Sequence, residues 1–358
     1  MSNDLLFDII AALAKILIFV HIALILAAYM SLAERKVSAW MQDRIGPNRV
    51  GYGGALQPIA DAVKFLFKED VVPGHVDKVL YVLAPAICVV PAFLVLAVIP
   101  FGPPVAVLGR SVQLVIADLD IGILWVFAIS SLGVYGITFA GWASNSKYPL
   151  MGGVRASAQM ISYEICLGLS VVGIFMATGS LRLTDVVTHQ ADGAWNIFVQ
   201  PVGFLVFAIA AFAETNRLPF DMPEAETELV AGYHTEYSSM KFAMFFMAEY
   251  TSMFVFSALI ATLFLGGWDI PFVSEAAMRT LGNWGAVLGF LSFMLKALAF
   301  MFFYVWVRWT LPRFRFDQLM ALGWKVLLPL ALANVVWTGG FYLAWPHIKP
   351  LLPAWMGS

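Results

Sequence analysis

The sequence has little charge and no marked excess of either sign. Charged residues make up 12% of the 358 residues, where a soluble protein has about 25%, and 61% of the residues are hydrophobic. The 21 Lys and Arg against 23 Asp and Glu give a formal net charge of -2, which leaves no basic surplus to neutralise a nucleic-acid backbone. We therefore exclude a soluble globular protein and expect no nucleic-acid partner.

Cysteine and the common cofactor motifs are also scarce. The only two cysteines, Cys88 and Cys166, lie in unrelated apolar runs, so they cannot build a disulfide framework, a zinc site or an iron–sulfur ligand set. The sequence has no Walker A loop, no dinucleotide glycine fingerprint after a strand, and no histidine pair at ligand spacing in a helix. We expect no metal, flavin, haem or NADH on this chain, so any redox centre must belong to a partner.

Apolar runs long enough to cross a bilayer dominate what is present. A hydrocarbon core about 30 Å thick needs a helix of about 20 apolar residues. Runs that meet this need cover residues 5–31, 79–100, 117–142, 157–178, 197–213, 242–267, 286–306 and 324–345. They lack the alternation of a barrel strand, and an open sheet cannot satisfy its backbone in lipid. The predicted fold class is all-α: one polytopic integral membrane helical bundle over residues 1–358, with about eight transmembrane helices and structured cytoplasmic loops.

The distribution of Lys and Arg predicts the orientation. The loops after the first, third, fifth and seventh spans hold 15 of them, and the opposite face holds four. The 15 are Arg35, Lys36, Arg44, Arg49, Lys64, Lys68, Lys78, Lys147, Arg155, Arg217, Lys241, Arg308, Arg313, Arg315 and Lys325, and the four are Arg110, Arg182, Arg279 and Lys349. By the positive-inside rule we expect a bacterial cytoplasmic membrane protein with both termini periplasmic, or its counterpart in the mitochondrial inner membrane.

The longest interruption, residues 32–78, predicts an interfacial amphipathic loop. A turn-rich stretch around residues 46–54 precedes a segment with two faces. The apolar face carries Leu56, Ile59, Val63 and Phe67, and the polar stripe carries Gln57, Asp61, Lys64 and Lys68. This pattern predicts a helix lying at the cytoplasmic interface, either as a plain anchor with solvated charges or as part of a site.

A second unusual loop, residues 214–241, is acidic where the positive-inside rule expects basic residues. Its acids are Glu214, Asp221, Glu224, Glu226, Glu228 and Glu236, and its only bases among Lys and Arg are Arg217 and Lys241. Pro223 suits the first position of a short helix whose dipole would favour Glu224 and Glu226. An acidic capped helix explains part of this pattern but not six acids between two spans.

Three ionisable residues fall inside the predicted spans. Glu164 and Glu249 each lie about 10–12 Å from the cytoplasmic edge if their helices begin near Ser157 and Lys241. Buried carboxyls at one level suit proton transfer, although interhelical hydrogen bonds to Tyr163 or Tyr250 are a structural alternative. Lys296, near the middle of the seventh span, needs an anionic partner or water.

From the residues alone, two mechanisms stay open. An ion transporter would use carboxylates along a buried path. A quinone-handling protein would need an apolar tunnel with a few polar groups at the head. A purely structural anchor is a third interpretation, and it predicts that acid-to-amide changes are silent.

The loop residues closely resemble the H-type membrane subunit of respiratory complex I, the proton-pumping NADH:quinone oxidoreductase. The matching stretches are AERK (33–36), QDRIGPNRVG (42–51), QPIADAVK (57–64), GWASN (141–145), SYE (162–164), ETNRLPFD (214–221), PEAE (223–226) on to residue 237, and PRFRFDQ (312–318). The similarity covers roughly residues 26–343. Related hydrogenase and plastid subunits keep parts of this pattern.

The resemblance implies a subunit at the junction of the membrane arm and the peripheral arm. Electrons would come from the terminal iron–sulfur cluster of a peripheral partner and reduce a quinone, either ubiquinone or menaquinone. The quinone-binding residues implied are Glu34, Arg35, Asp61, Lys64, Arg217, Phe220 and Arg313. The proton path implied is Glu164, Glu214, Glu224, Glu226, Glu228, Glu236 and Glu249, to which we add Lys296 from its place in the membrane.

In this interpretation the protein binds quinone and couples its reduction to proton translocation, with other membrane-arm subunits as partners. The alternative is an antiporter-like ion-translocating component of a membrane-bound hydrogenase or of another donor:quinone complex. Some relatives carry a further acid in the third helix, where this chain has Ser130 and Ser131.

Overall fold

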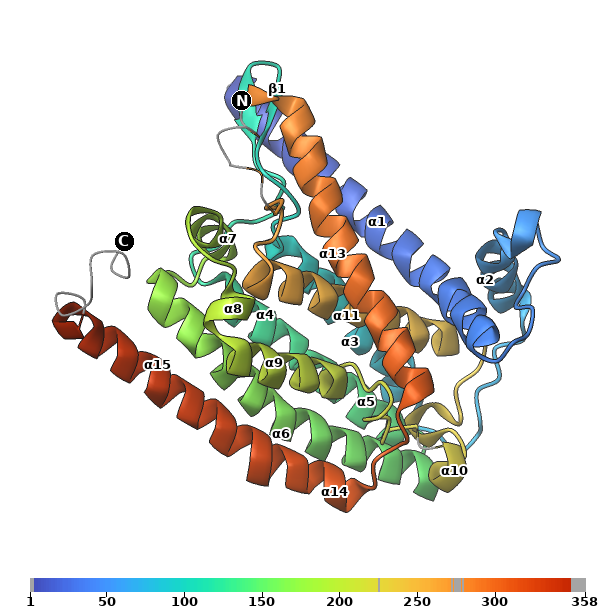
Figure 1. The fold of residues 1–358 in the computed structure, drawn as a ribbon. Helices are drawn as coiled ribbons and strands as arrows, with labels where there is room; N and C mark the ends of the chain where they lie inside the picture. The colour runs from blue at the N-terminus through green and yellow to red at the C-terminus, as the bar shows by residue number, and fades with distance from the viewer. Residues whose placement is uncertain (1–2, 225, 272, 274–277, 279, 349–358) are drawn as a thin grey trace.

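The chain folds into a bundle of long helices that run between two ends of the molecule (Figure 1). The structure is a computed structural model that describes residues 3–224, 226–271, 273, 278 and 280–348. Its α-helices are α1 (Asn3–Met41), α2 (Gln57–Phe67), α3 (Lys78–Val95), α4 (Gly122–Ser130), α5 (Leu132–Ala143), α6 (Lys147–Thr178), α7 (Leu183–Asp192), α8 (Asn196–Val199), α9 (Pro201–Glu214), α10 (Glu226–Leu229), α11 (Ser239–Phe264), α13 (Asn283–Thr310), α14 (Phe316–Ala321) and α15 (Leu328–Ile348). The shorter elements are the 3-10 turns η1 (Tyr52–Gly54), η2 (Leu96–Val98) and η3 (Gly232–His234), the π-helical turn η4 (Leu322–Leu327), and the strands β1 (Val105–Val107) and β2 (Arg110–Val112).

The predicted all-helical membrane bundle is confirmed. Among the described residues, seven helices are long and apolar enough to cross a membrane. The predicted fifth span differs, because it is divided into α8 and the shorter α9, which has only 14 residues. Pro201 occupies the first turn of α9 and has no N–H to continue a helical ladder through Gln200.

The first helix is longer than predicted. The prediction ended the span at Ser31 and began the loop at residue 32, whereas α1 continues to Met41. That boundary was wrong because Glu34 and Arg35 mark a change in hydropathy without breaking the helix. Both residues consequently stand on a rigid element. The interfacial loop begins after Met41, and its predicted amphipathic helix is confirmed as α2.

The acidic loop also differs in detail. No helix begins at Pro223, and the short helix α10 begins at Glu226. The fourth helix begins at Lys147 and not near Ser157, so the equal-depth estimate for Glu164 and Glu249 loses its basis. Arg279 and Lys349, which entered the charge count, lie outside the described residues.

The helices differ in how much they are covered. In α11, 61% of the most apolar stretch is buried, compared with 11% in α1. The centre of the bundle is therefore α11 with α3, α6 and α9 around it, while α1 presents most of its surface outward. The buried core includes Tyr163, Phe207, Phe254 and Phe293.

The two ends of the bundle carry different loops. The start of α1 lies beside the β1–β2 hairpin at one end, while the end of α1, α2 and α10 lie toward the other (Figure 1). In the hairpin, the Cα partners are Val105 with Val112 and Val107 with Arg110. The predicted periplasmic and cytoplasmic loops thus belong to opposite ends.

Thiol labelling tests which end faces the cytoplasm. Ser111 and Asn48 are exposed at opposite ends, whereas the native Cys88 and Cys166 are buried. We expect Ser111→Cys to react with a membrane-impermeant thiol reagent in intact cells. Asn48→Cys should react only after the membrane is opened, because the basic loops face inward. The reverse labelling pattern would contradict the orientation.

Candidate functional site

A buried ionic cluster joins three helices and the start of the acidic loop. Arg217, just after α9, donates two hydrogen bonds from Nη1 to Glu34 of α1, each 3.0 Å long. Its Nε lies 2.6 Å from Oε1 of Glu249 on α11. Arg308, near the end of α13, also pairs with Glu34. We call Glu34, Arg217, Glu249 and Arg308 the ionic cluster.

Tyr250 completes the surroundings of the ionic cluster. Its hydroxyl donates a 2.8 Å hydrogen bond to Glu34, and its ring lies 4.5 Å from the Arg217 guanidinium. The side chains of Arg217 and Glu34 are 4% and 7% exposed, so each depends on the other for solvation. A buried ion is tolerated only when its charge and hydrogen bonds are matched, as they are here for Glu34.

One face of the cluster borders a cavity of about 680 Å³ between α1, α2 and α11, which we call the large cavity. Its polar side chains include Glu34, Arg35, Asp61, Lys64, Tyr250 and Arg308. Its apolar side chains include Leu24, Phe65, Phe242, Met244, Phe246 and Met247. The cavity therefore combines a charged end with an apolar wall, which is the arrangement an amphiphilic ligand needs.

Asp61 holds the charged end of the large cavity in a defined geometry. Its carboxylate forms an ion pair with Arg35 of α1 and accepts a 2.9 Å hydrogen bond from Gln57 of α2. Burial alone would raise the pKa of Asp61, but these hydrogen bonds and the charges of Arg35 and Lys64 outweigh it and lower the pKa. The carboxylate thus stays ionised at neutral pH, and α2 is tied to α1.

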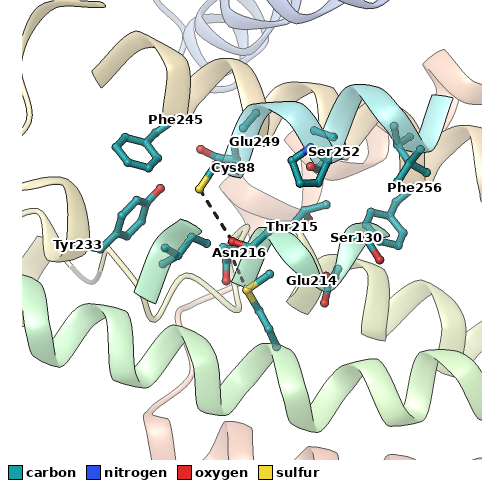
Figure 2. Close-up of a pocket in the computed structure, with 18 of the residues that line it drawn as sticks. Cys88, Ser130, Glu214, Thr215, Asn216, Tyr233, Phe245, Glu249, Ser252 and Phe256 are labelled. Carbon is teal, nitrogen blue, oxygen red and sulfur yellow. Dashed lines mark hydrogen bonds between the residues drawn. The ribbon is translucent and has the colours of Figure 1, made fainter. Parts of the chain in front are cut away.

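A second, smaller cavity lies inside the bundle (Figure 2). It has a volume of about 70 Å³, and we call it the inner cavity. Three of the predicted acids line it: Glu214, Glu224 and Glu249. Figure 2 shows Glu214 and Glu249 on different segments around one space that Ser130, Cys88 and Tyr233 also border.

The acids of the inner cavity are poorly paired apart from Glu249. Oε2 of Glu214 is enclosed and has no hydrogen-bond partner. The carboxylate of Glu164 lies near enough to repel that of Glu214. Burial first, and then the charges of Glu249 and Asp221, raise the pKa of Glu224 well above its ordinary value. These acids therefore share one electrostatic environment, and a change in one changes the others.

Glycines set the position of the acidic loop on α6. Gly232 has φ +60°, and a Cβ there would lie 1.7 Å from the carbonyl oxygen of Pro223. A Cβ on Gly152 of α6 would lie 2.8 Å from the same oxygen. Since only glycine allows this approach, the loop folds back closely enough for Glu224 to reach the inner cavity.

Two predicted quinone-binding residues do not line the large cavity. Phe220 is 4% exposed, and its ring packs 5.4 Å from Tyr163 and 5.5 Å from Phe314. Arg313 forms a 2.8 Å ion pair with Asp221. Burial raises the pKa of Asp221, although the Arg313 charge opposes it. Both residues support the loop beside the ionic cluster.

Several predicted proton-path residues lie elsewhere. Glu228 is half exposed and pairs with Arg155 at 2.6 Å, while Glu236 is held through its backbone carbonyl, which accepts a 2.7 Å hydrogen bond from Tyr81. Glu226 begins α10, and its side chain is outside the described part of the chain. Neither Glu228 nor Glu236 lines the inner cavity.

Lys296 is separated from the acids. Its ammonium donates to the carbonyls of Leu265, Gly267 and Asp269 at 2.7, 3.0 and 2.5 Å. These carbonyls follow the C-terminus of α11, about 24 Å along that helix from Glu249 at 1.5 Å per residue. The partners are carbonyls and not the anion that the sequence suggested, so the cation caps a helix end.

The tyrosine hydrogen bonds considered as an alternative for the acids are used elsewhere. Tyr163 donates to the carbonyl of Leu319 at 2.9 Å, and Tyr250 donates to Glu34. Sequence reasoning missed the role of Tyr250 and Arg308 at Glu34. Arg308 counted only as a positive charge, and its position at the end of a span was the one available signal.

The comparisons with known proteins agree with this architecture. The sequence model of the NADH dehydrogenase family matches residues 14–339. The chain is 53% identical over 337 residues to an H-type subunit of NADH-quinone oxidoreductase, number 2, from Geobacter sulfurreducens, and the match covers 94% of this chain and 98% of the relative. The chain belongs to the family of H-type NADH-quinone oxidoreductase subunits.

Other members of the H-type family are similarly close. The H-type protein number 1 of Cytophaga hutchinsonii is 50% identical over 322 residues, covering 90% of this chain and 94% of the relative. NADH-quinone oxidoreductase subunit 8 of Rhodothermus marinus is 52% identical over 327 residues, covering 89% and 93%. The likeness spans the ionic cluster and both cavities. Within the part of this chain that the structure describes, no three His, Cys, Asp or Glu side chains form a group that could hold a metal ion.

Proposed function

We propose that this chain forms a quinone chamber at the large cavity and couples quinone reduction to proton translocation through the inner cavity. The observation that carries the proposal is the ionic cluster. Glu34 and Arg308 line the large cavity, Glu249 lines the inner cavity, and Arg217 joins Glu34 to Glu249. A charge that appears in one cavity is therefore felt in the other.

The large cavity suits a quinone in size and chemistry. Ligand sites of about 300–1,000 Å³ are typical for small molecules, and this cavity falls in that range. Phe242, Phe246 and Met247 would contact the apolar tail, and Arg35, Asp61 and Lys64 would face the polar head. Ubiquinone and menaquinone share this chemistry.

The coupling step follows from charge. Electrons from the terminal iron–sulfur cluster of a peripheral-arm partner would make the quinone head negative until it takes up protons. That charge, beside Glu34, changes the balance of the ionic cluster and so the protonation of Glu249, Glu224 and Glu214. Glu164 is coupled to this set through Glu214.

The proposed setting is the cytoplasmic membrane of a bacterium, with both termini periplasmic. In that orientation the end of α1, α2 and the acidic loop face the cytoplasm and meet the peripheral arm. Other membrane-arm subunits would pack on the outward surfaces of the bundle and continue the proton path.

Substitutions at the charged end of the large cavity test the quinone site. We expect Asp61→Asn and Arg35→Ala to raise the KM for quinone about tenfold, since each removes one partner of a half-buried pair worth about 1 kcal/mol or more. NADH oxidation by a hydrophilic artificial acceptor should stay at the wild-type rate. The measurement is steady-state kinetics on purified complex with a short-chain quinone.

Arg315→Ala is the control, because Arg315 pairs with Asp317 at the surface and lies outside the large cavity. Unchanged quinone KM in both cavity variants would remove the large cavity from quinone binding and would favour the antiporter-like alternative. Equal loss of quinone and artificial-acceptor activity would indicate failed assembly, which a native gel would report directly.

A further inference from the structure

The ionic cluster links the two cavities but cannot pass a proton between them. Every direct connection in it runs through Arg217, whose guanidinium lies between Glu34 and Glu249. An arginine side chain does not release its proton in proteins. The cluster therefore transmits charge, and a proton that moves between the cavities needs another group.

His234 lies where such a group is needed. It is on η3, is 7% exposed, and its Nδ1 lies 3.8 Å from Oε1 of Glu224, which lines the inner cavity. On its other sides, the ring packs 5.2 Å from Phe242 and 5.9 Å from Phe246. Both phenylalanines line the large cavity. The imidazole thus stands between the walls of the two cavities.

The environment of His234 is unusual for a packing residue. Its Nδ1 is enclosed and has no hydrogen-bond partner, whereas a buried histidine normally has one. The distance of 3.8 Å to Glu224 is too long for a hydrogen bond, and a small side-chain rotation shortens it to bonding length. The nitrogen is therefore positioned for an intermittent contact with this carboxyl.

We infer that His234 carries protons from Glu224 to the large cavity, a role that rests on the proposed function. The Glu224 carboxyl gives its proton to Nδ1, which makes the ring an imidazolium. The imidazolium then releases the proton on Nε2 toward the large cavity, where reduced quinone takes it up. Glu224 is left as a carboxylate, the ring is left neutral in its other tautomer, and a ring flip restores the first tautomer.

The protonation states of the resting pair agree with this direction. Burial lowers the pKa of His234 to about 4, so the ring is neutral at physiological pH. The raised pKa of Glu224 keeps that carboxyl protonated. Proton donor and proton acceptor are thus both ready, and loss of the proton leaves a new negative charge in the inner cavity beside Glu249.

Three substitutions at His234 test the inference in the purified complex. We expect His234→Phe, which keeps an aromatic ring, and His234→Gln, which keeps polarity, to lower NADH:quinone turnover tenfold or more, in line with the ~10²–10⁴-fold effect of losing a proton-transfer group. Quinone KM and oxidation of NADH by the artificial acceptor should not change. In His234→Ala, which leaves a space, added imidazole should restore turnover, whereas it should not restore His234→Phe.

His189→Ala is the matched control, because His189 is an exposed histidine on α7. It should keep the wild-type rate and show no response to imidazole. Wild-type turnover in His234→Phe, or a slow His234→Ala that imidazole does not accelerate, would overturn the inference. Either result is distinct from failure of the quinone site, which would appear as an unchanged quinone KM in Asp61→Asn.

Discussion

Replacing Arg217 by methionine will destabilise the protein by about 3–5 kcal/mol, because the change leaves buried carboxylates without their shared cation. Glu34 is 7% exposed at its side chain and receives two hydrogen bonds from Arg217. Glu249 loses the only cation with which it forms an ion pair among the described residues. We expect little assembled complex in membranes, measured by native electrophoresis, and a lower thermal inactivation midpoint of what remains.

Two further variants make the Arg217 prediction specific. Arg315→Met removes an exposed partner of Asp317 and should change stability by about 0–1 kcal/mol. The triple change Arg217→Met, Glu34→Gln and Glu249→Gln should recover part of the lost assembly, because it removes the uncompensated charges as well. Wild-type assembly and thermal stability in Arg217→Met would show that the carboxylates are solvated by other means.

Replacing Glu214 by glutamine will separate electron transfer from proton translocation. Glu214 has an enclosed carboxylate oxygen without a partner, so the amide keeps the shape and breaks no hydrogen bond at that atom. It does remove a titrating group from the inner cavity. We expect assembled complex with normal oxidation of NADH by the artificial acceptor, and about a tenfold or greater fall in quinone turnover and in the proton gradient.

Glu164→Gln should behave like Glu214→Gln, because the two carboxylates interact. Glu228→Gln serves as the control, since Glu228 is half exposed, pairs with Arg155 and lies outside the inner cavity. The assay reconstitutes the complex in vesicles and follows quinone reduction and internal acidification together. Normal turnover with a normal proton-to-electron ratio in the double variant Glu164→Gln and Glu214→Gln would leave these carboxyls a structural role.

Several predictions from the sequence held because their signals are local. An apolar run of about 20 residues needs no distant partner to become a membrane helix, and seven of the predicted spans are long helices. The amphipathic pattern from Leu56 to Phe67 likewise identified α2, and it put Asp61 and Lys64 on the stripe that lines the large cavity.

Other predictions failed where a boundary depends on packing. Hydropathy ended the first span at Ser31, but α1 continues because Arg217 and Arg308 satisfy Glu34 inside the bundle. Periodicity could not show that the fifth span divides at Gln200. That break is stabilised by hydrogen bonds from Gln200 to Thr338 and from Asn334 to Gln200, on a helix far along the chain.

The sequence by itself determined the membrane bundle, the amphipathic helix and the set of acids and bases available for chemistry, because these depend on composition and on neighbours within a few helical turns. Only the tertiary structure decided how that set divides. It placed Glu214, Glu224 and Glu249 in one cavity, Glu228 at the surface, and Lys296 on a helix end. The contacts responsible join residues 183 positions apart for Arg217 and Glu34, and 216 apart for Tyr250 and Glu34. No local pattern encodes such pairs, since they form only when the packed helices bring opposite charges together away from water.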